Sequence, residues 1–153
     1  MIRRYSLASA GLTIVTTAYT SGDMLGTEMT LTLSDRGNGP VGGKIVGVTC
    51  TDDSDVIGAL DLFFFEAAST PAADNAANSW ADANLQTLSC AVSLTTPLYD
   101  SGLNKAVTAP MAEMGVPFYA PTGVLYVNAI TRTGNAVFAA GATSLNYKIF
   151  VEI

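Results

Sequence analysis

Alternation of apolar and polar residues is the feature that most constrains how this chain can fold. It is clearest in Thr27–Ser34 (TEMTLTLS) and in Ser144–Ile153 (SLNYKIFVEI). A period of two places successive side chains on opposite faces of a strand, so the pattern is typical of strands with one buried and one exposed face. Phe150 interrupts the polar face of the second segment and is a candidate subunit-interface residue. Both segments therefore predict half-buried strands of a β-sandwich.

Further segments rich in β-branched and aromatic residues also predict strands. They are Leu12–Ala18, Lys44–Cys50, Ala59–Glu66, Leu88–Leu94, Val124–Thr131 and Ala136–Phe138. Clusters of Gly, Pro, Asn, Asp and Ser separate them, and Gly134-Asn135 predicts a tight hairpin. A chain of 153 residues fits one domain. About eight strands at this spacing predict a single-domain, all-β sandwich of jelly-roll type.

Three regions depart from the strand pattern. Asn78–Leu85 (NSWADANL) predicts one short helix with Asn or Ser as its N-cap, and Trp80 either packs beneath it or anchors an interface. Residues 1–11 are expected to form an N-terminal arm, which leaves residues 12–153 for the sandwich. Residues 95–123 contain four prolines and three glycines, so they predict a long loop with short extended pieces.

Composition argues against several classes of function. The chain has no histidine, which removes the commonest general base and a frequent zinc ligand. The alternation in Lys44–Cys50 predicts that Lys44, Val46, Val48 and Cys50 share one face. Cys50 and Cys90 are expected to be small buried hydrophobic residues, with a disulfide between them as the alternative. The net charge is −6 and the basic residues are scattered, so no nucleic-acid partner is expected. No segment has the apolar length of a membrane helix or the apolar core of a signal peptide, so no membrane partner is expected.

Three local patterns share features with known binding or catalytic sites. Gly37–Gly42 (GNGPVG) has the spacing of a dinucleotide-binding loop but leads into a strand, so it predicts a hairpin loop. Thr51–Asp55 (TDDSD) lacks the later ligands of an EF-hand, although another kind of calcium site there stays open. Asp61 lies within an apolar segment, and we expect a structural salt bridge, to Lys44 or Arg132, or an interface contact rather than catalysis. These patterns predict a protein that is not an enzyme and holds no cofactor.

Three segments together resemble a known family. They are Tyr19–Thr32 (YTSGDMLGTEMTLT), Gly58–Glu66 (GALDLFFFE) and Asp74–Leu85 (DNAANSWADANL). Their order and character are similar to those of small all-β proteins of tailed bacteriophages that decorate, or cement, the capsid. The resemblance spans roughly Leu12 to Ile153 and carries no catalytic residues. It implies a homotrimer that binds the major capsid protein on the outside of the virion and is made in the bacterial cytoplasm.

Candidate contact residues follow from expected exposure, because the resemblance supplies no residue-level motif. The expected capsid contacts are Arg3, Arg4, Tyr5, Met111, Met114, Phe118 and Tyr119, and the expected subunit contact is Phe150. The main alternative is a head-fibre or tail-associated module that binds host glycans. Its aromatic candidates are Tyr99, Phe118, Tyr119 and Tyr126. A third hypothesis is an enzyme acting on polysaccharide through Asp61.

Overall fold

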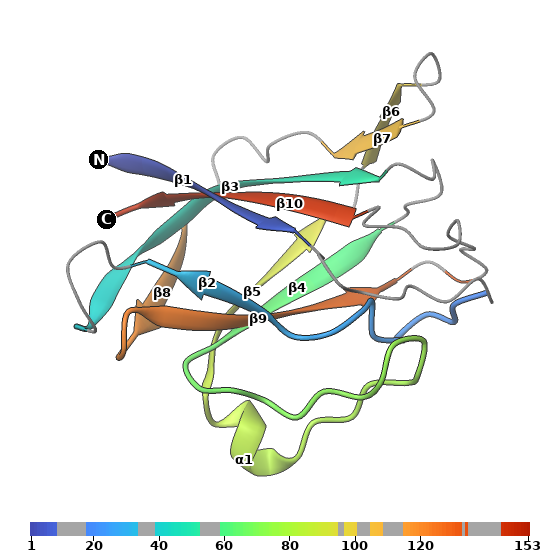
Figure 1. Cartoon of the computed structure of the whole chain (residues 1–153), viewed down its shortest axis with the longest axis horizontal. Coiled ribbons are helices and arrows are strands. Elements are labelled where there is room, and N and C mark those ends of the chain that lie inside the picture. The colour runs from blue at the N-terminus through green and yellow to red at the C-terminus, as the bar shows by residue number, and fades with distance from the viewer. Residues whose placement is uncertain are drawn as a thin grey trace.

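The structure is a computed structural model that describes residues 1–8, 18–33, 39–52, 59–94, 97–100, 105–108, 115–132, 134 and 145–153. Its strands are β1 (Ile2–Ala8), β2 (Met29–Thr32), β3 (Val41–Asp52), β4 (Leu60–Phe65), β5 (Leu88–Leu94), β6 (Pro97–Asp100), β7 (Lys105–Thr108), β8 (Val116–Ala120), β9 (Val124–Thr131) and β10 (Leu145–Glu152). One helix, α1 (Asp82–Leu85), lies among them. Figure 1 shows two sheets facing each other as the layers of a sandwich, so the predicted all-β sandwich is confirmed.

The strands pair in the order of a jelly roll. The larger sheet runs β1-β10-β3, and both β8 and the β6–β7 hairpin lie along the far edge of β3. The smaller sheet runs β2-β9-β4-β5. The antiparallel pairs β1 with β10, β2 with β9, β3 with β8, and β4 with β5 are those of one long hairpin folded on itself. This is the connectivity of an eight-stranded jelly roll, to which β6 and β7 are added.

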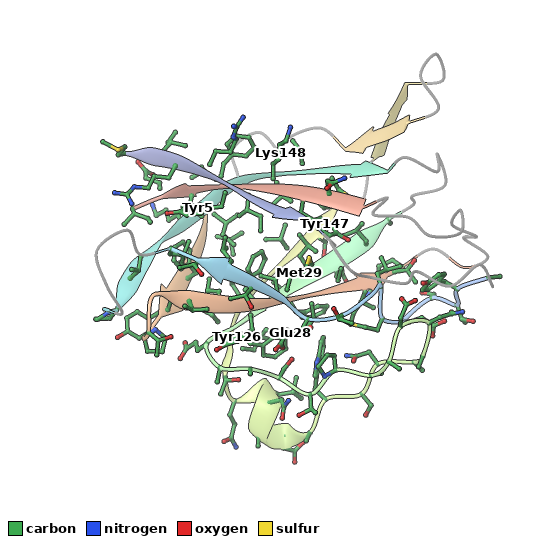
Figure 2. The ribbon with its side chains drawn as sticks, in the orientation of Figure 1. Tyr5, Glu28, Met29, Tyr126, Tyr147 and Lys148 are labelled. Atoms are coloured by element: carbon green, nitrogen blue, oxygen red, sulfur yellow. The ribbon has the colours of Figure 1, made fainter. Side chains whose placement is uncertain are left out.

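The hydrophobic core lies between the two sheets and is built by alternate residues of each strand. The larger sheet contributes Ile45, Val48, Cys50, Tyr147, Ile149 and Val151, and the smaller sheet contributes Leu31, Leu60, Leu62, Phe64, Leu125 and Val127. Figure 2 shows Tyr147 and Met29 pointing into this space, whereas Lys148 points away from it. The alternation found in the sequence of β2 and β10 is therefore the alternation between core and solvent.

Side chains join the two sheets at both of their edges. On one side, the Tyr5 hydroxyl of β1 donates a hydrogen bond to the Leu33 carbonyl oxygen, just beyond β2, at 3.0 Å. On the other side, the Ser89 hydroxyl of β5 donates to the Tyr119 carbonyl oxygen of β8 and accepts from the Tyr119 amide, both at 2.9 Å. These contacts satisfy backbone groups that no strand pairing reaches.

The prediction of an N-terminal arm over residues 1–11 is wrong for residues 2–8. These residues form β1, which pairs with β10 without a break from Ile2 to Ala8. The sandwich thus begins at residue 2 rather than residue 12. This strand could not be recognised from the sequence because Arg3 occupies an inward position, opposite buried Val151. A charged residue at an inward position breaks the alternation of apolar and polar residues. Most of the predicted strand Leu12–Ala18 lies outside the described residues.

Residues 95–123 contain more strand than the predicted long loop allowed. They include β6, β7 and the whole of β8. Pro97 is the first residue of β6, and Pro117 lies in β8, for which β3 is the one paired strand among the described residues. Proline is tolerated at strand starts and on edge strands because no hydrogen bond from its nitrogen is needed there. Proline content was therefore a poor guide to loop structure in this region.

β3 and α1 each differ in one detail from the sequence prediction. A bulge in β3 sets both Val46 and Gly47 opposite Phe150, so Val46 does not share a face with Val48 and Cys50 as predicted. The helix covers only Asp82–Leu85, and its N-cap is Ala81, which makes no side-chain capping bond. The predicted strand Ala136–Phe138 and the hairpin before it lie outside the described residues.

Candidate functional site

We call the solvent-facing side of β1, β10, β3 and β8 the outer face. Strand register arranges its residues in cross-strand rows. One row contains Ile2, Glu152, Lys44 and Pro117; the next contains Arg4, Phe150 and the Val46–Gly47 bulge; a third contains Ser6, Lys148 and Thr49. Tyr119, opposite Gly42, lies beyond the first row. Residues directly opposite each other on neighbouring strands lie on the same side of a sheet, so these rows form one continuous surface.

The outer face combines apolar side chains with positive charge. Ile2 is 64% exposed and Tyr119 is 50% exposed, while Phe150 and Val46, in the second row, are half-buried. Arg4, Lys44 and Lys148 are exposed, and Glu152 is the one acidic residue in the described rows. Apolar groups bordered by charged residues are typical of surfaces that bind another protein.

The structure brings together some of the predicted contact residues and separates others. Arg4, Tyr119 and Phe150 all lie on the outer face. Arg3 and Tyr5 lie on the other side of β1, because neighbours along a strand point in opposite directions. The remaining predicted contacts are Phe118, Met111 and Met114.

Phe118 is 6% exposed and belongs to the hydrophobic core, so the prediction that it contacts a capsid is wrong. Tyr5 is half-buried against the core and its hydroxyl is bonded within the molecule. Met111 and Met114 lie outside the described residues. Sequence reasoning did not select Ile2, Lys44 or Glu152 as contact residues, although the alternation in Ser144–Ile153 placed Glu152 on the same face as Phe150.

The segments that carry the family resemblance come together on the opposite side of the molecule. Residues 66–86 cross the outward side of the smaller sheet and carry α1 (Figure 1). The Trp80 ring packs on Phe63 and Phe65 of β4, with ring centroids 4.8 Å and 5.1 Å apart. The predicted packing of Trp80 beneath its own segment is thus confirmed.

Tyr19 and its neighbours fasten this covering segment. The Tyr19 hydroxyl donates to the Asp74 carboxylate, 2.8 Å from each oxygen, and the Gly26 amide donates to the same group at 2.6 Å. Backbone bonds join Met24 to Asn75 and Ala76 in both directions. The resemblance therefore rests on residues that pack into one structural unit, in which Tyr19 is 1% exposed.

A polar network lies beneath the same segment. The Ser69 hydroxyl and amide both donate to Glu28 Oε2, and the amide nitrogen of fully buried Asn128 donates to the Ser69 hydroxyl oxygen at 2.7 Å. Figure 2 shows Glu28 and Tyr126 on this side of β9, away from the core between the sheets. In the described part of the chain, Asn128 Oδ1, Asn78 Nδ2 and Trp80 Nε1 are buried without a hydrogen-bond partner.

Asp61 makes the structural salt bridge that the sequence predicted. Its Oδ2 lies 3.1 Å from an Arg132 guanidinium nitrogen, and Asp61 itself is buried. Lys44, the other expected partner, belongs to the outer face of the larger sheet. The salt bridge gives the buried carboxylate a partner, which suits a structural role.

The cysteines and acidic residues form no reactive cluster in the described ranges. Neither Cys50 nor Cys90 forms a disulfide, which excludes the alternative of a disulfide between them. Burial raises the pKa of the Cys90 thiol to about 12. Within those ranges, no three His, Cys, Asp or Glu residues are grouped so that they could hold a metal ion. Asp53 and Asp55, considered for calcium, lie outside them.

Comparisons with known proteins add no family to this picture. No family model matches the sequence, and no curated protein matches it. Over the described residues, no helix has both the length and the apolar character needed to cross a membrane.

Proposed function

We propose that this protein is a capsid decoration, or cement, protein of a tailed bacteriophage. The observation that carries the proposal is the outer face, where Arg4 and Tyr119, expected as capsid contacts, lie on the same surface as Phe150, which was expected as a subunit contact. A broad, mixed apolar and basic sheet face suits docking on a protein lattice better than it suits holding a small molecule. The resemblance of the segments around Trp80 supports the same conclusion.

The proposed mechanism is bridging of neighbouring major capsid protein subunits on the outside of the virion. A protein that binds only the assembled shell stabilises that shell by mass action. As a homotrimer it would multiply weak contacts, because the second and third subunits bind at a high effective concentration. No chemical step is required, and the protein would be neither an enzyme nor a carrier of a cofactor.

The glycan-binding alternative receives less support from the arrangement of aromatic residues. Phe118 is in the core, Tyr119 is on the outer face of the larger sheet, and Tyr126 is on the outward side of β9 in the smaller sheet. The side chain of Tyr99 lies outside the described residues. A sugar platform needs aromatic rings on one surface, and no two of these three residues share one.

Copy number in purified particles of the source phage tests the proposal. Quantitative mass spectrometry should find this chain in a simple ratio to the major capsid protein, because a cement protein occupies repeated lattice sites. A handful of copies per particle would instead support a fibre or tail component. Absence from particles would overturn the virion proposal. A glycan array then tests the alternative directly, and light scattering of the free protein tests the trimer.

A further inference from the structure

We propose that the outer face recognises an acidic protein surface. The inference rests on the proposed function, since it identifies the chemistry of the partner that the face would meet. It starts from the distribution of charge. Arg4, Lys44 and Lys148 project from three successive rows of the face, and the described residues of these rows include one carboxylate, that of Glu152, in a chain whose net charge is −6.

The opposite side of the molecule carries the contrasting charge. Acidic residues gather in and beneath the segments that cover the smaller sheet: Asp23, Glu28, Asp61, Glu66, Asp74 and Asp82. The described basic side chain there, Arg132, is paired with Asp61. An acidic partner would attract the outer face and repel the covered side, so long-range electrostatics would orient the molecule before contact.

The arrangement of the outer face favours a protein over other acidic partners. Phe150 lies among the basic residues, and Ile2 and Tyr119 add apolar area on the two outermost strands of the face, a mixture of apolar and charged groups that is typical of protein interfaces. Nucleic-acid binding depends mainly on many basic side chains along a phosphate backbone. The outer face has only a few described basic side chains, with the Glu152 carboxylate among them, so it suits nucleic acid poorly. A second copy that met this one outer face to outer face would present the same basic residues, and like charges would oppose each other.

Removing positive charge from the outer face should weaken docking, and removing negative charge should strengthen it. The experiment measures binding of the full chain to purified heads that lack it, over a range of salt concentrations. The double variant Lys44→Gln, Lys148→Gln should bind roughly three- to thirtyfold more weakly than wild type at low salt, with a smaller difference at high salt. Glu152→Gln should bind more tightly, because it removes the carboxylate that an acidic partner repels.

The matched control is the double variant Thr30→Glu, Thr32→Glu. It changes the net charge by the same amount, at exposed positions of β2 in the other sheet. It should bind heads as wild type does. Equal weakening of both double variants would show that only total charge matters, and wild-type binding by the lysine variant would remove the face from docking. Weaker binding by Glu152→Gln would also overturn the inference, since it would indicate a basic partner group.

A second probe separates this inference from the proposed function. If wild type does not bind heads, the capsid proposal fails, and retention on immobilised poly-L-glutamate still tests the face. The same order of variants on poly-L-glutamate supports an acidic protein partner, and equal retention overturns it. Tighter binding to duplex DNA or to phosphatidylserine vesicles than to poly-L-glutamate would also overturn it, in favour of a different anionic partner.

Discussion

At the scale of single residues, Cys90 shows how partial burial controls chemistry. It lies in β5 opposite Phe64 and packs against the core. Burial disfavours the thiolate, which raises the pKa from 9.0 to about 12. The folded protein should therefore react slowly with iodoacetamide at about pH 8, where well under 1% of such a thiol is ionised. Urea-unfolded protein should react much faster, and equal rates would contradict the assigned burial.

The same pKa shift predicts a loss of stability in alkali. Because the folded state holds the Cys90 proton more tightly than the unfolded state, its contribution is complete below about pH 9 and is lost as the pH rises towards about 12. The stability of wild type relative to Cys90→Ala should thus fall over this range in urea unfolding experiments. A constant difference between the two proteins would contradict this linkage.

Ser69 is the centre of the polar network beneath the covering segment. Its hydroxyl donates to Glu28 and accepts from Asn128, which is fully buried. Ser69→Ala should cost about 1–3 kcal/mol of unfolding free energy, since it leaves the Asn128 amide with only a 3.4 Å contact to Glu28. The control is Ser93→Ala, at an exposed position of β5. Equal unfolding free energies for the two variants would show that the network contributes little.

At the scale of elements, close strand approach depends on one glycine of β3. A Cβ atom added at Gly43 would overlap the Glu152 carbonyl oxygen and press on the Phe118 ring, whereas one at Gly42 would meet only ordinary contacts. Gly43→Ala should therefore destabilise the protein by about 2 kcal/mol or more through strand displacement, and Gly42→Ala should be nearly neutral. Thermal melting of the two variants measures the difference. Equal melting temperatures would show that β3 and β10 move apart at little cost.

Strands with a clean period of two, or with many β-branched and aromatic residues, could be predicted from the sequence, whereas β1 and β8 could not. Leu88–Leu94 and Val124–Thr131 were predicted with the bounds that the structure has, and β10 within one residue at each end. β1 was missed because Arg3 faces inward, and the face of Val46 was misassigned because a bulge adds one residue to the count. Local pattern cannot reveal either effect, since each depends on what the neighbouring strand supplies.

The candidate site was predictable only as separate residues. Arg4, Tyr119 and Phe150 come from three distant parts of the sequence, and each was expected to be exposed. Only the register of the strands shows that they share a face. Phe118, the residue before Tyr119, was also expected to be exposed, but its side chain is buried in the core. To decide which of two adjacent residues is exposed, one must know which face of the strand each residue of β8 takes. The prolines of β8 instead made its sequence look like a loop.

At the scale of the whole molecule, the jelly roll joins its first strand to its last. Met1 and Ile153 exchange backbone hydrogen bonds of 3.2 Å and 3.3 Å, and Figure 1 shows the two chain ends side by side. β1 is the neighbour of β10 on that edge, and it also supplies the Tyr5 bond to the smaller sheet. The N-terminal strand therefore has both a structural and a proposed docking role, on its two opposite faces.

These two roles can be separated experimentally. Deleting residues 1–8 should lower the melting temperature by roughly 10 °C or more, because β10 loses its partner along its whole length and the core beneath Tyr5 opens. The double variant Ile2→Ser, Arg4→Gln keeps the backbone pairing and changes only outward side chains, so it should melt close to wild type and yet bind heads more weakly. A truncated protein that melts like the full chain would show that β1 is dispensable for the fold, and would return residues 2–8 to the role of an arm. A double variant that unfolds as easily as the truncated chain would show that the outward side chains also stabilise the sheet, and its loss of docking would then say nothing about the outer face.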